Sequence, residues 1–262
     1  MELNLKGKVV LVTGGSKGIG YSCAMRFAEE GAKVIIASRS RANLDVAAAS
    51  LKEKGLTVAT VVADFVQPDA ATRAITEAEK LLGPIDILVN SAGAAVHTPP
   101  EDLTMQSWHN AMDAKYFSYI HAMQAVLPGM AARGRGNIVN IIGQGGKRAS
   151  PNHLAGGAAN AALMLVSTGL ANAFGPKGIR VNAINPGGTI TERQILRMQA
   201  AEKRTGVSIA EQQAKAASNL PLRRLALPED IADTTVYLAS ERAGYVTGVC
   251  ISMDGGALST II

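Results

Sequence analysis

The chain has 262 residues, of which 47% are hydrophobic and 18% charged, a composition typical of a folded protein with a sizeable core. Its formal net charge of +5 comes from scattered lysines and arginines, which argues against nucleic-acid binding and suits a small anionic ligand instead. The sequence has no apolar N-terminal run and no hydrophobic stretch of about 18 residues, so we expect neither secretion nor a membrane-spanning segment.

Short apolar runs rich in β-branched residues alternate with longer, Ala-rich segments along the whole chain. Such runs are typical of strands that are covered on both faces of a parallel sheet. The expected strands are residues 8–13, 33–38, 57–63, 85–90, 137–142, 179–185 and 249–253. Between the expected strands 137–142 and 179–185, Leu163, Val166 and Leu170 recur at helical steps, which predicts an amphipathic helix over 161–174. The alternation predicts a single doubly wound, Rossmann-like α/β domain over residues 1–262, with a parallel seven-stranded sheet.

The segment 190–220 is polar, helical in period and too long for a simple connector. We expect it to be a mobile cap over a site rather than a second domain. Its basic residues would suit an anionic or thioester-carrier substrate, although the polar face of exposed helices is the simpler explanation. These basic residues are Arg193, Arg197, Lys203 and Arg204.

The two cysteines, Cys23 and Cys250, lie far apart in the sequence within apolar surroundings. This placement predicts buried thiols in a reducing compartment, and we therefore expect a cytoplasmic protein. No metal site is predicted.

A glycine-rich segment, VTGGSKGIG at residues 12–20, follows the first expected strand and opens the first expected helix. Glycines at the spacing G-x-x-x-G-x-G let the backbone turn sharply and approach a pyrophosphate at the helix N-terminus. The position between a strand and a helix makes this signal much stronger than a glycine-rich turn alone. The predicted cofactor residues of this loop are Gly14, Ser16, Lys17, Gly18, Ile19 and Gly20.

Five separated motifs, in order and at family spacing, resemble those of the short-chain dehydrogenase/reductase family. They are residues 13–20, NSAG at 90–93, PGGTIT at 186–191, PLRRLALPEDIA at 221–232 and YVTGVCISMDGG at 245–256. The resemblance covers essentially the whole chain. It implies a Rossmann-like domain that binds NAD(H) or NADP(H), acts on a small-molecule carbonyl or secondary alcohol, and assembles as a homotetramer or homodimer.

The end of the second expected strand decides between the two nicotinamide cofactors. An Asp or Glu there would bind the adenosine ribose hydroxyls and repel a 2′-phosphate. This chain instead has Ser38 and Arg39, with Lys17 in the glycine loop. If Lys17, Arg39 and the Ser38 hydroxyl converge on that ribose, they favour NADP(H) over NAD(H). The alternative is that the two cations are merely solvated.

The resemblance implies further cofactor contacts. Asp64 is similar to the family residue that bonds the adenine amino group, although a helix N-cap explains it nearly as well. The small residues of NSAG would let the cofactor lie flat against the backbone, and Thr191 resembles the hydroxyl that reaches its phosphate or carboxamide side. The remaining implied contacts are Asn90, Ala92, Gly93, Pro186, Gly187 and Thr189.

Members of the resembled family catalyse with a Tyr that acts as acid or base, a Lys that lowers its pKa, a Ser that orients the substrate and an Asn that supports a proton relay. The flanking segments PNHLAGGAANAAL and IRVNAINPG align this chain without a gap. The Tyr, Lys, Ser and Asn positions then hold Gly156, Asn160, Gly143 and Lys115. All four positions are changed.

Two interpretations follow. In the first, the site is degenerate and the protein is a non-catalytic NADP(H)-binding or sensing protein, because Gly143 and Gly156 cannot donate a proton. In the second, the site is rewired, because the amine and the amide appear exchanged between Lys115 and Asn160. A non-redox enzyme that uses the same pocket is a third alternative.

In a rewired site Lys115 would hold the ribose or polarise a carbonyl, with a pKa lowered by burial. The alternative is a helix residue whose amine reaches solvent. His153 has a suitable intrinsic pKa for the acid, although a cap or a solvent contact is the commoner role of such a histidine. Additional residues that would line the substrate side are Gln144, Lys147 and Arg148.

Overall fold

A seven-stranded sheet in the order β3-β2-β1-β4-β5-β6-β7 forms the centre of the computed structural model, which describes residues 2–93 and 96–258. Every neighbouring pair of strands is parallel. The strands are β1 (Val9–Thr13), β2 (Lys33–Ser38), β3 (Val58–Val62), β4 (Ile87–Asn90), β5 (Gly136–Ile141), β6 (Ile179–Pro186) and β7 (Cys250–Met253). The predicted strands deviate from these bounds by at most two residues, and the predicted fold class is confirmed.

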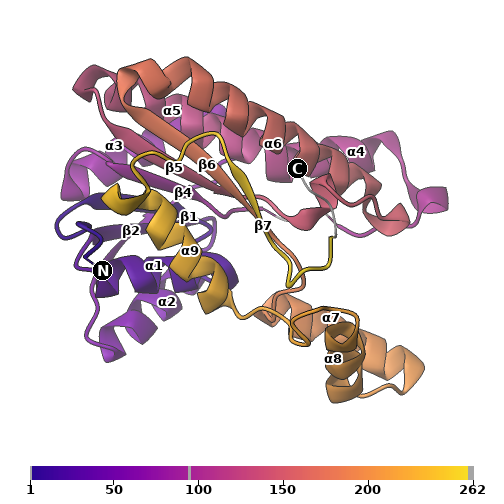
Figure 1. Ribbon diagram of the computed structural model, residues 1–262. Helices are drawn as coiled ribbons and strands as arrows, with labels where there is room; N and C mark the ends of the chain where they lie inside the picture. Colours follow the sequence, from indigo (N-terminus) through magenta and orange to yellow (C-terminus); the bar gives the residue numbers. More distant parts are fainter. Residues whose placement is uncertain (1, 94–95, 259–262) are drawn as a thin grey trace.

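Helices cover both faces of the sheet (Figure 1). They are α1 (Gly18–Glu29), α2 (Arg41–Glu53), α3 (Pro68–Leu82), α4 (Met105–Ala111), α5 (Ser118–Arg133), α6 (Leu154–Phe174), α7 (Glu192–Thr205), α8 (Ile209–Ser218) and α9 (Pro228–Ala239). Helices α3, α5 and α6 pack on one face, and α1, α2 and α9 pack on the other. A π-helical segment, η2 (Met112–Phe117), joins α4 to α5.

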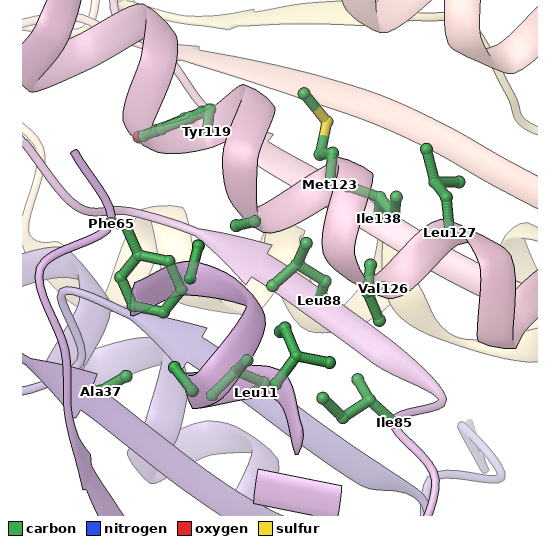
Figure 2. Close-up of a cluster of buried hydrophobic side chains, with 14 of the residues drawn as sticks. Leu11, Ala37, Phe65, Ile85, Leu88, Tyr119, Met123, Val126, Leu127 and Ile138 are labelled. Atoms are coloured by element: carbon green, nitrogen blue, oxygen red, sulfur yellow. The ribbon is translucent and has the colours of Figure 1, made fainter. Parts of the chain in front are cut away.

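The hydrophobic core has two halves because successive residues of a strand point to opposite faces. In β1, Leu11 joins the cluster beneath α3, α5 and α6, whereas Val12 joins the cluster on the other face. Figure 2 shows Leu88 of β4 between Leu11 of the neighbouring strand β1 and Met123 of α5, in one cluster. The inner strands are therefore buried on both faces, which explains why most of them read as nearly continuous apolar runs.

The strand order reverses between β1 and β4, since the chain first proceeds outward to β3 and then returns to the other side of β1. In open α/β sheets of this kind, ligands bind in the crevice outside the carboxyl ends of the strands at such a reversal. Thr13 ends β1 and Asn90 ends β4, so the glycine loop and the NSAG segment both begin at this crevice.

Helix α6 is longer than predicted and packs on the same face of the sheet as α3 and α5. It begins seven residues before the expected 161–174, and Leu163 and Ala171 are buried in the core. The segment Pro151–Lys177 is long and apolar enough by composition to cross a membrane, with a mean hydropathy of 1.4. The prediction that no such stretch exists is wrong by this measure, because the many alanines and leucines of α6 raise the average. Its packing against β6 and the neighbouring strands identifies α6 as a core helix.

The predicted cap segment 190–220 forms α7 and α8, which project together from the rest of the fold (Figure 1). The first turns of α7 face the crevice, and Thr191 caps this helix by accepting a hydrogen bond from the Gln194 amide at 3.3 Å. That these two helices act as a mobile cap stays a prediction.

Candidate functional site

A cavity of about 1080 Å³ lies at the carboxyl ends of the central strands. All predicted cofactor residues except Gly20 and Asn90 line it. Those on its wall are Gly14, Ser16, Lys17, Gly18, Ile19, Ser38, Arg39, Asp64, Ala92, Gly93, Pro186, Gly187, Thr189 and Thr191. The predicted catalytic residues Lys115, Asn160 and His153 line the same cavity, so the fold brings the two predicted groups together.

Gly20 and Asn90 support the wall from behind. A Cβ on Gly20 would overlap the carbonyl oxygen of Gly14, so this glycine lets α1 approach the loop. Asn90 is fully buried, accepts a hydrogen bond from the Thr13 hydroxyl at 3.4 Å and donates to Asn140 at 2.9 Å. Asn140 donates in turn to Ser167 of α6 at 2.9 Å, so a buried polar chain runs from β1 through β4 and β5 to α6. That Asn90 and Gly20 contact the cofactor stays a prediction.

The glycine loop fits the phosphates of a dinucleotide. Gly14 and Gly18 have φ angles of +66° and +54°, which favour glycine over residues with a side chain. At the N-terminus of α1, Lys17 makes no side-chain cap hydrogen bond and the first turn holds no acidic residue. The first amide groups of this helix are therefore available to an anion in the cavity, and the helix dipole favours its negative charge.

Asp64 closes the turn that leads from β3 to α3. Its carboxylate accepts a hydrogen bond from the Val66 amide at 3.1 Å, and its carbonyl accepts from the Gln67 amide. Helix α3 has Gln67 at its N-cap, so the helix-cap explanation of Asp64 is wrong. Asp64 lies on the cavity wall at the same sheet edge as Ser38, which ends the neighbouring strand β2.

Lys115 is the most unusual residue of the site. Its side chain is buried, with 7% relative exposure, and its Nζ donates to the Tyr119 hydroxyl at 2.8 Å and to the Ile141 carbonyl at 2.9 Å. The Tyr119 hydroxyl donates to the same carbonyl at 2.6 Å. Burial, and secondarily the charge of Arg193, lower the pKa of Lys115 from 10.5 to about 7. The alternative in which this amine reaches solvent is wrong.

The π-helical segment η2 explains how a lysine enters the wall of the cavity. Within this segment, the Ser118 hydroxyl lies within hydrogen-bond distance of the Ala114 and Lys115 carbonyls, at 3.0 and 3.2 Å. The Ala114 carbonyl lies against Gly93, where a Cβ would overlap it. The glycine of NSAG is therefore required by the bulged helix as well as by the cavity, consistent with the frequent occurrence of π-bulges at functional sites.

Asn160 lies opposite, on α6, and is also buried. A Cβ on Gly143 would stand 3.3 Å from its Nδ2, and Gly143 has a φ angle of +133°. The following turn, η3 (Gln144–Gly146), packs so closely on α6 that a Cβ on Gly146 would clash with the backbone at Asn160 and Ala161. A serine at position 143 would therefore be strained in this backbone.

His153 stacks on His97, with ring centroids 4.5 Å apart. Its Nδ1 is buried and has no hydrogen-bond partner among the described residues. Burial, then the charges of Arg197 and Lys115, lower the pKa of His153. His153 is the N-cap residue of α6, as the cap alternative expected, although its side chain makes no cap hydrogen bond.

Several residues of the site differ from expectation. Gln144 and Arg148 line the cavity, but Lys147 does not, because its amine donates to the Cys250 carbonyl and the Ser252 hydroxyl, each at 3.1 Å. Arg193 and Arg197 line the cavity and are also exposed, so they are solvated residues of α7 that face the site.

Tyr119 and His97 were not singled out by sequence reasoning. Tyr119 stands four residues after Lys115, one helical turn away, and this spacing was the available signal. No motif marks His97.

Comparisons with known proteins agree with this architecture. A family model described as enoyl-(acyl carrier protein) reductase matches residues 14–257. L-xylulose reductase of Mus musculus is 33% identical over 261 residues, 99% of this chain and 100% of that protein. The L-sorbose reductase of Gluconobacter frateurii, solved with NADPH and L-sorbose, has a TM-score of 0.95 and 33% identity, with full coverage of both chains.

A second solved structure is similar in fold and bears on the unusual site. It is an NADPH-bound short-chain oxidoreductase of Pseudomonas aeruginosa PAO1 described as containing an atypical catalytic centre, with a TM-score of 0.89 and 30% identity over 97% of this chain and 98% of that one. The relatives are reductases and oxidoreductases, which does not favour a non-catalytic role. The chain therefore belongs to the short-chain dehydrogenase/reductase family, as an NAD(P)-dependent oxidoreductase that transfers a hydride.

Proposed function

We propose that the protein interconverts a carbonyl compound and a secondary alcohol with NADP(H), and that Lys115 transfers the proton. The observation that carries this proposal is the buried amine of Lys115 on the cavity wall, whose pKa is lowered to about 7. A general acid or base is most effective when its pKa lies near the working pH. An ordinary lysine would hold its proton too tightly to exchange it at neutral pH.

The contacts of Lys115 leave it able to act on a substrate. An ammonium has three N–H bonds, and two of them are directed to the Tyr119 hydroxyl and the Ile141 carbonyl. The third is available to a substrate oxygen in the cavity. Burial raises the pKa of Tyr119, so its hydroxyl stays protonated and keeps its bond to the Ile141 carbonyl. Tyr119 is thus a positioning residue.

During reduction, the Lys115 ammonium would donate its free proton to the oxygen of the carbonyl as that oxygen gains negative charge. The neutral amine would then regain a proton from water through the open cavity. When bound, the nicotinamide supplies the hydride for reduction or accepts it for oxidation. The residues proposed to hold the cofactor are those of the glycine loop, the NSAG segment and Pro186–Thr191 on the cavity wall, with Asp64 at the adenine end.

We propose that the family's Ser, Tyr, Lys and Asn are replaced here by Gly143, Gly156, Asn160 and Lys115. The strained backbone that a serine would have at Gly143 supports this assignment. The amide of Asn160 would orient the substrate oxygen, and His153 would assist in proton exchange. The atypical centre of the Pseudomonas aeruginosa relative supports the idea that this fold accepts such changes.

A labelled-cofactor experiment tests the reaction. NADPH that carries deuterium on the transferable C4 position should be oxidised in the presence of a panel of ketones, and the deuterium should appear on the carbinol carbon of the product. Absence of NADPH oxidation across aliphatic, aromatic and charged ketones, together with tight NADPH binding, would contradict the proposal.

Preference for NADP(H) over NAD(H) is a separate proposal, which rests on Arg39, Lys17 and Ser38 at one end of the cavity. Arg39 has no salt-bridge partner within the described ranges, whereas Lys17 pairs with Glu192 at 3.1 Å on the surface. We expect Arg39→Asp to weaken NADPH binding by about 10- to 100-fold, because a charged hydrogen bond to the phosphate is lost and a repulsion is added. NADH binding should be kept or strengthened, because the new Asp can bind the adenosine ribose hydroxyls. The measurement is fluorescence titration of both cofactors, and equal effects on both would refute the assignment.

We also propose that the protein is cytoplasmic, that α7 and α8 act as a mobile cap, and that the chain forms a homodimer or homotetramer. Light scattering of the purified protein tests the last point.

A further inference from the structure

The charges on the substrate side of the cavity are strongly unbalanced. Around Lys115 the wall carries Arg148, Arg193, Arg197 and the stacked pair His97 and His153. Asp64 and Glu192 are the only carboxylates among the described residues of the wall. Asp64 lies at the adenine end and Glu192 is paired with Lys17, so neither neutralises this group.

Arg193 and Arg197 stand four residues apart on α7, one helical turn from each other. In the described part of the chain neither forms a salt bridge or a side-chain hydrogen bond, although other arginines, such as Arg224 with Asp230, are paired. Like charges at this spacing repel each other. Burial lowers the pKa values of Arg193, His97 and His153 most, and the charge of Arg197 lowers each of them further. A positive charge that no carboxylate compensates has this effect on neighbouring cationic groups.

Lys115, Arg193 and Arg197 line the same cavity. Arg193 is close enough to lower the pKa of Lys115 and to affect Tyr119, and both arginines line the cavity that Lys115 lines. The arginines lie on the projecting helix, whereas Lys115 lies on the bulged helix next to the sheet (Figure 1). A ligand in the cavity can therefore contact the Lys115 amine with one end and the guanidinium groups of α7 with the other.

We propose that the substrate is an anionic carbonyl compound, whose carboxylate or phosphate group is bound by Arg197 and Arg193 while its carbonyl oxygen lies at Lys115. This inference rests on the proposed function and specifies its substrate class. Guanidinium groups bind carboxylates and phosphates through two parallel hydrogen bonds, and the cavity supplies the anion with no competing carboxylate nearby. The anion would also offset the repulsion between the two arginines.

The cofactor's own phosphates are a second source of negative charge, so the test measures both ligands. The probes are 4-acetylbenzoate and its methyl ester, two ketones of similar shape that differ by one charge. They are titrated by calorimetry into the protein saturated with NADP⁺, which cannot reduce a ketone, so that binding is measured without turnover. The variant is Arg197→Glu, and the matched control is Arg204→Glu, on the same helix, exposed and outside the cavity wall.

We expect the unaltered protein and Arg204→Glu to bind 4-acetylbenzoate about 10- to 100-fold more tightly than the ester, in line with the strength of charge-assisted hydrogen bonds. Arg197→Glu should abolish that preference and leave NADPH affinity unchanged. Equal binding of the two ketones by the unaltered protein, a preference that survives in Arg197→Glu, or a loss confined to NADPH affinity would each overturn the inference. If the charge preference is found but neither ketone is reduced by NADPH, the proposed reaction fails and the anion site stands.

Discussion

Replacing Lys115 with methionine should lower kcat for NADPH-dependent ketone reduction by a factor of about 10² to 10⁴, the usual contribution of a general acid. Methionine has a similar length and suits a buried position, and the hydrogen bond of Tyr119 to the Ile141 carbonyl does not require the amine. The variant should therefore fold and bind NADPH. The measurements are steady-state kinetics and fluorescence titration of NADPH.

A control variant separates this effect from a general loss of positive charge. Lys147→Met removes a lysine that lies near the site but does not line the cavity, and kcat should change little. If Lys115→Met retains full kcat, Lys115 is a structural residue only. A pH profile gives a further readout, because reduction needs the ammonium form and should decline as pH rises through about 7, whereas alcohol oxidation should increase. Lys115→Arg should lose both transitions, since arginine does not release its proton in this range.

The second large effect concerns stability and pH. Relative to Lys115→Met, the free energy of unfolding of the unaltered protein should rise between pH 7 and about 10.5. The folded state has the lower pKa, so within this window the unfolded chain binds more protons than the folded one, and raising the pH stabilises the fold. Below pH 7 the lysine is protonated in both states, and the full cost of burying its charge is present. A pKa difference of 3 to 4 units corresponds to about 5 kcal/mol, at roughly 1.4 kcal/mol per unit.

Urea unfolding of both proteins at a series of pH values measures this difference, because the titrations of groups that do not interact with Lys115 cancel between them. Lys17→Met serves as the matched control, since Lys17 is exposed and pairs only with Glu192 at the surface. Its stability relative to the unaltered protein should not follow the same curve. A flat difference between the unaltered protein and Lys115→Met would mean that the buried amine is charged throughout and cannot serve as an acid near neutral pH.

Much of the architecture is readable from local patterns. Strands such as β1 and β2 are covered on both faces, so their apolar runs are nearly continuous. The glycine loop is equally clear in the sequence, because its glycines are required by backbone contacts between residues only a few positions apart. One such contact is the close approach of Gly20 to Gly14. The length of α6 was underestimated because its first turns are built from glycine and alanine, which carry little helical periodicity.

The chemistry of individual side chains was harder to predict. Asn90 occupies a family cofactor position but is fully buried in a polar chain with Thr13 and Asn140, and only strand neighbours far apart in sequence create that chain. Arg193 and Arg197 read as ordinary surface residues, because helical period alone does not tell which face of α7 meets the cavity. The register of the catalytic segment, by contrast, was available from its flanks.

The sequence by itself determined the sheet and the dinucleotide loop, because each depends on residues close together in the chain or on spaced motifs. It also led us to propose a lysine and an asparagine at exchanged positions. Only the tertiary structure decided whether the amine of Lys115 is buried or solvated, and therefore the direction of its pKa shift. Its amine is buried against Tyr119 and the Ile141 carbonyl, on a π-helical segment that packs against Gly93 of the loop after β4, and a pKa near 7 follows from that burial. Desolvation arises from surrounding atoms, and those atoms are contributed by segments that meet only when the chain is folded.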